Sequence, residues 1–172
     1  RAVEREVEAA VHAVEGTPAR LFINDHWQQA IAAGAYGVHL GQDDLTELSD
    51  EQLAVLRSSG LRLGISTHGY AEMLLADQVT PSYIAVGAIF PTTLKAMPTA
   101  PQGIARLRDY AHLMKSYPLV AIGGISEAQM PEIMATGVGS AAVVRAIVQS
   151  PEPEVAVMRL MRVISVQQQG TA

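Results

Sequence analysis

Hydrophobic positions along this chain follow two different spacings. Over residues 3–14, valines recur every three or four positions with acidic residues between them, which is typical of an amphipathic helix. Residues 19–24 are nearly continuous in apolar character, as expected of a strand buried on both faces. The chain therefore begins with a helix, and a buried strand follows it.

This succession of strands and helices continues to the end of the chain. Strands are predicted over residues 19–24, 37–40, 61–66, 82–87, 118–124 and 140–144. Helices are predicted over residues 3–14, 25–33, 50–59, 70–77, 104–114, 128–135 and 153–166, and a longer loop over 88–101. Such regular repetition favours a parallel sheet covered by helices, and the absence of a low-complexity linker favours one domain.

Two architectures fit this pattern: a doubly wound open sheet and a (β/α)₈ barrel that lacks some units. The first predicted helix has no strand before it. A barrel cut within the helix of its second unit would begin in this way. We therefore predict an α/β protein with a TIM barrel lacking its first two strands. Residues 1–172 would form a single barrel domain, from the helix of unit 2 to unit 8.

Composition narrows the class of protein. The 172 residues include no cysteine, which excludes disulfides, thiolate-bound zinc, iron–sulfur clusters and a cysteine nucleophile. A formal net charge of -5 argues against nucleic acid or an anionic membrane as partner. Neither a bilayer-spanning apolar run nor a signal-peptide pattern is found, so we expect a soluble cytoplasmic protein. A small phosphorylated ligand remains compatible with this charge.

Polar residues concentrate where the predicted strands end, which is where barrel enzymes carry their reactive groups. These segments are Asn24-Asp25, residues 41–44 and 66–68, the loop with Thr92, Thr93 and Lys95, Gly123-Gly124 and Val144-Arg145. Each has a simpler explanation: the acidic residues could cap helices or form turns, and the glycines could permit a tight turn. His39, within an apolar strand, is typical of a satisfied core histidine.

Taken together, the same residues predict a site for phosphorylated substrates. Asp25 and Asp44 follow adjacent strands, and two carboxylates with substrate phosphates are ligands that suit Mg²⁺. Lys95 is a natural partner for a phosphate or diphosphate. The glycines after the fifth predicted strand, with the end of the sixth, lie at the usual phosphate site of barrels. Two anion sites and one magnesium site indicate two phosphorylated substrates, one of them a diphosphate.

Five motifs, in this order, resemble the thiamine-phosphate synthase family, most closely its enterobacterial-type branch, with an N-terminal truncation. They are residues 23–27 (INDHW), 37–45 (GVHLGQDDL), 64–68 (GISTH), 90–95 (FPTTLK) and 121–125 (AIGGI). The resemblance covers nearly the whole chain. It implies a barrel transferase of thiamine biosynthesis that joins hydroxymethylpyrimidine diphosphate to thiazole phosphate, forming thiamine phosphate and releasing diphosphate.

The resemblance also implies roles for individual residues. Asn24, Ser66 and Lys95 would contact the pyrimidine diphosphate, with Ser66 and Lys95 as the catalytic pair. Asp25 and Asp44 would hold Mg²⁺. The thiazole phosphate would be bound by Thr92, Thr93, Leu94, Gly124, Val144 and Arg145. Charge on the leaving diphosphate would be neutralised without a covalent nucleophile.

Three departures from the family pattern affect these expectations. Leu94 replaces a threonine and Arg145 replaces a serine. The first two strands and a Gln-x-Arg-x-Lys diphosphate clamp have no counterpart. We therefore expect tighter binding of thiazole phosphate than of pyrimidine diphosphate, and slow turnover or none. An open barrel edge would also favour association between copies of the chain.

Three other functions can be compared with the same residues. A thiazole tautomerase-like isomerase would need no diphosphate site, so the carboxylate pair and Lys95 favour the synthase. A non-catalytic phosphate-binding barrel fragment would agree with Leu94, Arg145 and the truncation. A sugar-phosphate epimerase would not explain Asn24-Asp25 or residues 41–44. In each case the partners are small molecules.

Overall fold

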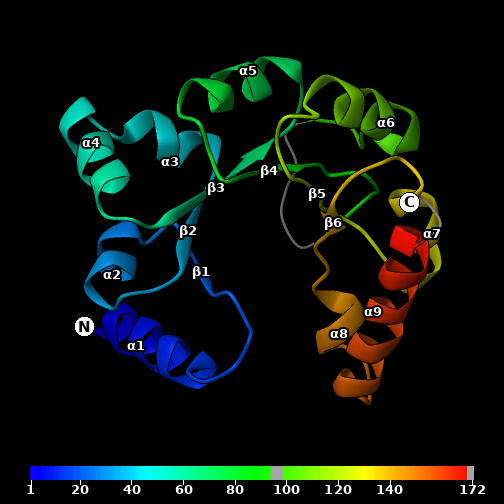
Figure 1. The fold of residues 1–172 in the computed structure, drawn as a ribbon, viewed down its shortest axis with the longest axis horizontal. Coiled ribbons are helices and arrows are strands. Elements are labelled where there is room, and N and C mark those ends of the chain that lie inside the picture. The colour runs from blue at the N-terminus through cyan, green and yellow to red at the C-terminus, as the bar shows by residue number, and fades with distance from the viewer. Residues whose placement is uncertain (94–98, 170–172) are drawn as a thin grey trace. The chain divides into compact units, whose positions relative to one another are not determined.

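The computed structural model describes residues 1–93 and 99–169, in which strands and helices alternate in an α/β fold (Figure 1). The strands are β1 (Phe22–Asn24), β2 (Gly37–Leu40), β3 (Arg62–Thr67), β4 (Tyr83–Val86), β5 (Leu119–Ala121) and β6 (Ser140–Ala141). The α-helices are α1 (Ala2–Val14), α2 (Trp27–Ala32), α3 (Gln42–Glu47), α4 (Asp50–Ser58), α5 (Tyr70–Gln78), α6 (Gly103–Leu113), α7 (Met130–Met134), α8 (Arg145–Val148) and α9 (Pro153–Gln169). A short 3₁₀ helix, Glu127–Gln129, precedes α7.

The strands follow one another in the sheet in the order of the chain, from β1 to β6. β1 pairs with β2 and β2 with β3, all in parallel, and so do β4 with β5 and β5 with β6. A doubly wound sheet would reverse its strand order at a switch point. The uniform order therefore agrees with the barrel alternative of the two that the sequence left open.

The chain forms two compact units, and residues 1–66 with 75–82 make up the first. Strand β2 supplies the centre of its core, because Val38 and Leu40 are fully buried between neighbouring strands and helices. Ile23, Leu63 and Ile65 extend this core from β1 and β3. This near-continuous burial explains why the strands lack a simple alternation of polar and apolar residues.

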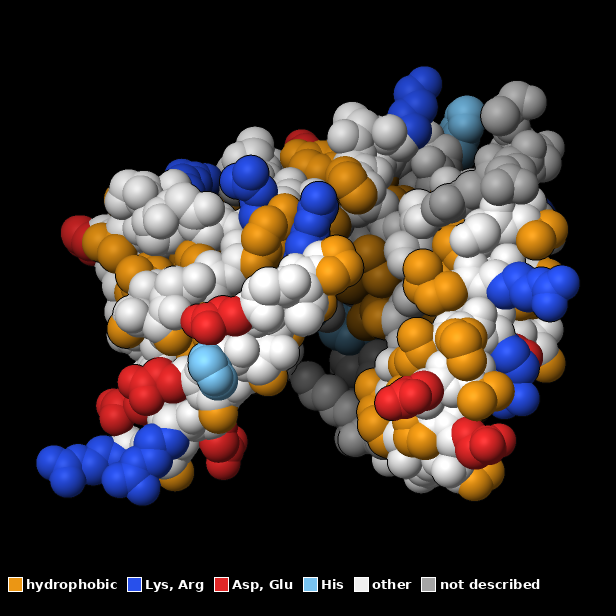
Figure 2. All heavy atoms as spheres, turned by 60° about the horizontal axis from the view of Figure 1, so that its bottom comes forward, with side chains coloured by type: hydrophobic (Ala, Val, Ile, Leu, Met, Phe, Trp, Pro, Cys, Tyr) orange, Lys and Arg blue, Asp and Glu red, His pale blue; other side chains and the backbone are white. Residues whose placement is uncertain are grey.

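The second unit comprises residues 67–74 and 83–172. Its core joins Ile84 and Val86 of β4 to Leu119 and Ala121 of β5, all 3 % exposed or less. α7 packs beside α9 in this unit (Figure 1). Other apolar side chains of α8 and α9, including Met158, remain exposed, and Figure 2 shows hydrophobic side chains gathered on this part of the surface.

Most predicted elements are present, but several have different bounds. The strand predicted over residues 19–24 begins only at Phe22, and β6 consists of two residues rather than five. Helices α3 and α8 were not predicted, because both are short and follow directly on strand ends. A turn was expected where α3 begins; instead Gly41 is extended and the helix continues to Glu47.

No helix among residues 1–93 and 99–169 combines the length and the apolar character that crossing a membrane requires.

We predict that Gly37→Ala destabilises the protein. A Cβ at position 37 would lie 2.4 Å from the Phe22 ring and 2.6 Å from the backbone oxygen of Arg62, so β2 would have to shift. Overpacking of this kind lowers the free energy of unfolding by about 1–3 kcal/mol, measurable by urea denaturation. Gly69→Ala is the matched control, because nothing lies within 4 Å of its Cβ position. Equal stability of the two variants would contradict the close packing at Gly37.

Candidate functional site

Two of the predicted site residues lie where β1 ends. Asn24, the last residue of β1, is in register with His39 of β2. Asp25 follows with a φ of 62°, and its backbone N–H donates to the His39 carbonyl over 2.9 Å. This bond fixes the Asp25 backbone beside β2, in a left-handed conformation that aspartate adopts more readily than most residues.

Asp44 lies in the first turn of α3, directly after β2. Its Oδ2 atom accepts a hydrogen bond from the Gly41 backbone N–H over 2.9 Å, so the side chain caps the helix it belongs to. A carboxylate has about four lone-pair positions, so this bond leaves capacity for a further ligand. The capping role considered for the acidic residues is thus confirmed for Asp44 and is compatible with a second role.

Ser66 of β3 is held by two residues from the β2 end. Its hydroxyl oxygen lies 2.7 Å from Nε2 of His39, and its backbone oxygen accepts a hydrogen bond from Nε2 of Gln42 over 2.8 Å. Burial lowers the pKa of His39 below its ordinary value, and the negative charge of Asp44 opposes this shift in part. Neutral imidazole is therefore favoured beside the serine.

Gln42 has a further property that sequence reasoning missed. Its Oε1 atom is buried, and no hydrogen-bond partner for it lies within the described parts of the chain. A buried acceptor without a partner is costly, so it marks a position where a ligand donor would be stabilised. The sequence signal was available: Gln42 lies two residues after the end of β2, in the same predicted segment, residues 41–44, as Asp44.

In the second unit, the segment after β4 lies against the end of β5. The backbone N–H of Ile89 donates to Ile122 over 2.9 Å, and that of Phe90 donates to Gly123 over 3.1 Å. At Gly124, which has a φ of +68°, a Cβ would lie 2.5 Å from the Pro91 oxygen and 2.7 Å from the Phe90 oxygen. The role expected of the glycines as a permissive turn is thus correct, and close approach of backbone is the reason.

Arg145 reaches back to this same segment. Its Nη1 atom donates to the Thr93 hydroxyl over 3.2 Å, and Val144 is the N-cap residue directly before α8. A small cavity of about 50 Å³ is lined by residues 123–125 and 142–145. A second cavity, about 190 Å³, is lined by Phe90, Thr92 and their neighbours. The predicted thiazole phosphate residues of this unit are thus close to one another, whereas Leu94 and Lys95 lie outside the described residues.

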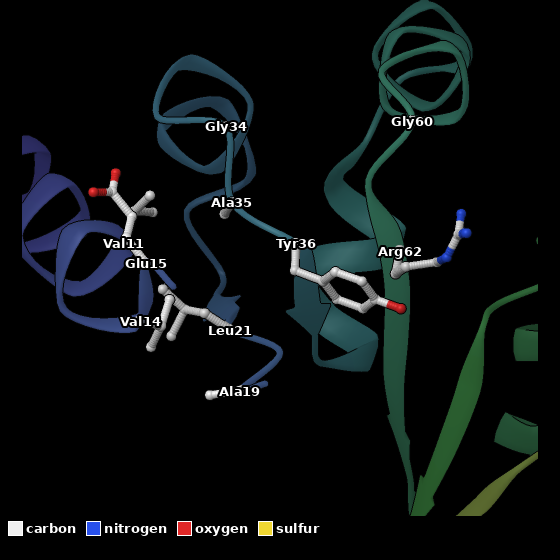
Figure 3. Close-up of a pocket in the computed structure, with 10 residues that line it drawn as sticks. All are labelled: Val11, Val14, Glu15, Ala19, Leu21, Gly34, Ala35, Tyr36, Gly60 and Arg62. Atoms are coloured by element: carbon white, nitrogen blue, oxygen red, sulfur yellow. The ribbon is translucent and has the colours of Figure 1, made fainter. Parts of the chain in front are cut away.

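A larger cavity, of about 470 Å³, lies at the opposite ends of the strands in the first unit (Figure 3). Its walls come from α1, from the residues that precede β1 and β2, and from Arg62 at the start of β3. Tyr36 lines it and contacts Phe22 edge to face. None of the predicted site residues lines this cavity.

Among the residues that the structure describes, no group of three or more histidines, aspartates and glutamates could hold a metal ion by itself. A metal bound by Asp25 and Asp44 would therefore need other oxygen ligands. Mg²⁺ is usually bound in this way, by one or two carboxylates with water and substrate phosphates. Two carboxylates with substrate phosphates are ligands that suit Mg²⁺, and the assignment to Asp25 and Asp44 stays a prediction.

Known proteins resemble this chain over most of its length. A family model described as thiamine monophosphate synthase matches residues 1–147. The thiamine-phosphate synthase of Neisseria meningitidis is 52% identical over 155 residues, which are 90% of this chain and 74% of that protein. The Yersinia pestis protein of the same name is 51% identical over 162 residues, 94% of this chain and 74% of its own.

A solved structure shows the same fold. The thiamine phosphate pyrophosphorylase from Pyrococcus furiosus superposes with a TM-score of 0.83 and 26% sequence identity, over 97% of this chain and 78% of that chain. The resemblance inferred from five short motifs is therefore confirmed over most of the chain, and the chain belongs to the thiamine monophosphate synthase family.

Proposed function

We propose that this chain couples hydroxymethylpyrimidine diphosphate to thiazole phosphate, forming thiamine phosphate and releasing diphosphate. The observation that carries the proposal is the 51–52% identity to thiamine-phosphate synthases over at least 90% of the chain. The test is to incubate the chain with both substrates and Mg²⁺ and to follow thiamine phosphate by chromatography. A folded chain that binds neither substrate and forms no product would contradict the proposal. Isomerisation of the thiazole without coupling would support the tautomerase alternative.

The first unit supplies the groups for the pyrimidine diphosphate. Asn24 and Ser66 would donate hydrogen bonds, and Asp25 and Asp44 would hold Mg²⁺. Lys95, which belongs to the second unit, would add a further cation. Bound Mg²⁺ would neutralise the negative charge that develops on the leaving diphosphate. Gln42 would accept a hydrogen bond from the substrate at its buried Oε1 atom. Loss of the diphosphate leaves an electron-poor carbon for the thiazole nitrogen to attack, so no protein nucleophile is needed.

The second unit supplies the groups for the thiazole phosphate. Gly124 permits the close approach of its backbone to the segment that carries Thr92 and Thr93. Arg145 donates to the Thr93 hydroxyl, and it also lines the same small cavity as Gly123 and Gly124. Backbone N–H groups, hydroxyls and one guanidinium form a donor set that suits a phosphate monoester. On this proposal, the arginine in place of the family's serine adds a cation to the site.

The metal assignment makes a specific prediction. Asp25→Asn and Asp44→Asn should each raise the Mg²⁺ concentration for half-maximal rate by about tenfold, because an amide is a weaker ligand than a carboxylate. An asparagine at position 44 can still accept the Gly41 N–H, so the α3 cap is retained. Asp43→Asn is the control, since Asp43 is an exposed neighbour on the same turn. An unchanged Mg²⁺ requirement in both site variants would exclude this metal assignment.

A second prediction concerns Gly124. Gly124→Ala should weaken thiazole phosphate binding by about tenfold, since the new Cβ would force the Phe90 and Pro91 carbonyls away from β5. Gly137→Ala is the matched control: Gly137 also has a positive φ, +91°, but nothing lies within 4 Å of its Cβ position. Backbone strain alone would therefore affect both variants. Calorimetric titration should show impaired binding only in Gly124→Ala.

A third prediction concerns the pH dependence of stability. Because the pKa of His39 is lowered in the folded protein, the unfolded chain binds the proton more readily. The contribution of His39 to the free energy of unfolding is thus constant above about pH 7 and decreases as pH falls through and below about 6.5. Wild type should lose more stability than His39→Gln between about pH 7.5 and 5.5.

Urea denaturation at both pH values measures this difference. His112→Gln, a substitution of an exposed histidine on α6, provides the control. If wild type and His39→Gln lose equal stability on acidification, then His39 is not the group responsible.

A further inference from the structure

Two backbone hydrogen bonds join the start of the segment between β4 and α6 to its end. The backbone N–H of Gln102 donates to the Ala88 carbonyl over 2.8 Å, and that of Gly103 donates to Ile89 over 3.0 Å. The two ends of residues 88–101 are therefore adjacent, and Gln102 lies at their junction. The first part of this segment carries Thr92 and Thr93, which the proposed function assigns to the thiazole phosphate.

The Gln102 side chain uses both its donor and its acceptor within this junction. Its Nε2 atom donates to the Thr99 hydroxyl over 3.3 Å and to the Ala100 carbonyl over 3.2 Å. Its Oε1 atom accepts from the Tyr110 hydroxyl over 2.8 Å and from Nη1 of Arg106 over 3.2 Å. One amide group thus joins the returning part of the segment to α6.

This junction is buried, although it is built from polar groups. Gln102 is 7% exposed, and Tyr110 is completely buried. Burial also raises the pKa of the Tyr110 hydroxyl, so that it remains a donor. Unsatisfied polar groups in such a place are costly, so the bonds constrain the geometry strongly. A primary amide supplies two donors to the segment and an acceptor to the helix at once.

The opposite part of the segment is held by the sheet. Phe90 donates to Gly123 on β5's end, and the carbonyls of Phe90 and Pro91 pack against Gly124. Thr92 and Thr93 therefore follow a part fixed by β5, while Gln102 fixes the part that returns. A change at Gln102 would alter the path of the segment without removing any group proposed to contact substrate.

We propose that Gln102 is a positioning residue, which sets the substrate-binding segment of residues 88–93 through the buried amide junction with Tyr110, Thr99 and Ala100. The inference rests on the proposed function, since that assigns thiazole phosphate to Thr92 and Thr93. It predicts that a change at Gln102 weakens the binding of thiazole phosphate, although Gln102 is not assigned a contact with that phosphate.

The experiment compares two variants with the wild-type chain. Gln102→Glu keeps the size and the acceptor but removes the two donors to Thr99 and Ala100. It should raise the Kd for thiazole phosphate by about tenfold, with the pyrimidine diphosphate Kd within about twofold. Tyr110→Phe removes one donor to the amide oxygen and should raise the thiazole phosphate Kd by about threefold. Gln78→Glu, the same change at an exposed site on α5, should leave both values unchanged.

Calorimetric titration of each folded variant, with its thermal midpoint measured in parallel, decides between the outcomes. Should Gln102→Glu fail to fold, Tyr110→Phe carries the test. A lowered midpoint with unchanged thiazole phosphate binding in both variants would show a structural role only and would overturn the inference. If wild type itself binds neither substrate, the proposed function fails instead. If wild type binds both substrates and the variants match it, only the inference about Gln102 fails.

Discussion

Parallel pairing of the strands is the constraint on which the candidate site depends. Each parallel ladder fixes the register of neighbouring strands, and it places their carboxyl ends at one edge. Asn24 is in register with His39, which is in register with Gly64. Two residues beyond Gly64, Ser66 comes within 2.7 Å of the His39 ring. Residues far apart in the chain are thereby brought into one hydrogen-bonded group.

The loops at this edge are fixed more firmly than their composition suggests. Asp44 caps α3 through the Gly41 N–H, and Asp25 is held by the His39 carbonyl. The Asp44 carboxylate is held through one oxygen, which leaves other lone pairs available to a ligand. A capping role and a ligand role are therefore compatible in Asp44.

In the second unit, backbone contacts fix the segment that follows β4. Gly124 allows two carbonyls to approach closely, and the Gln102 amide closes the segment from its other side. Fixing backbone in this way limits the conformational entropy that would be lost when a phosphate binds. Arg145 contacts Thr93 at the same place, so the departure from the family pattern is accommodated in the structure.

The sequence by itself determined the class of fold and most of its elements. Apolar runs such as residues 37–40 are buried because strands between other strands must be, and this is visible without coordinates. The polar residues after each strand, Asp25 and Ser66 among them, could be selected because parallel strands share an edge. The five motifs in their order, residues 37–45 among them, were distinctive enough to identify the family.

Only the tertiary structure decided which side chains interact. His39 had the pattern of a core residue, yet its ring meets Ser66 because the two strands are adjacent in the sheet. Gln102 has no local pattern that distinguishes it from a surface glutamine, and the place of Gln42 after a strand does not show that its side chain is buried. Their roles depend on burial and on partners up to 24 residues away, as in the bond between Gln42 and Ser66. Hydrogen bonds of this kind need specific distances and directions, which residue spacing along a chain does not specify.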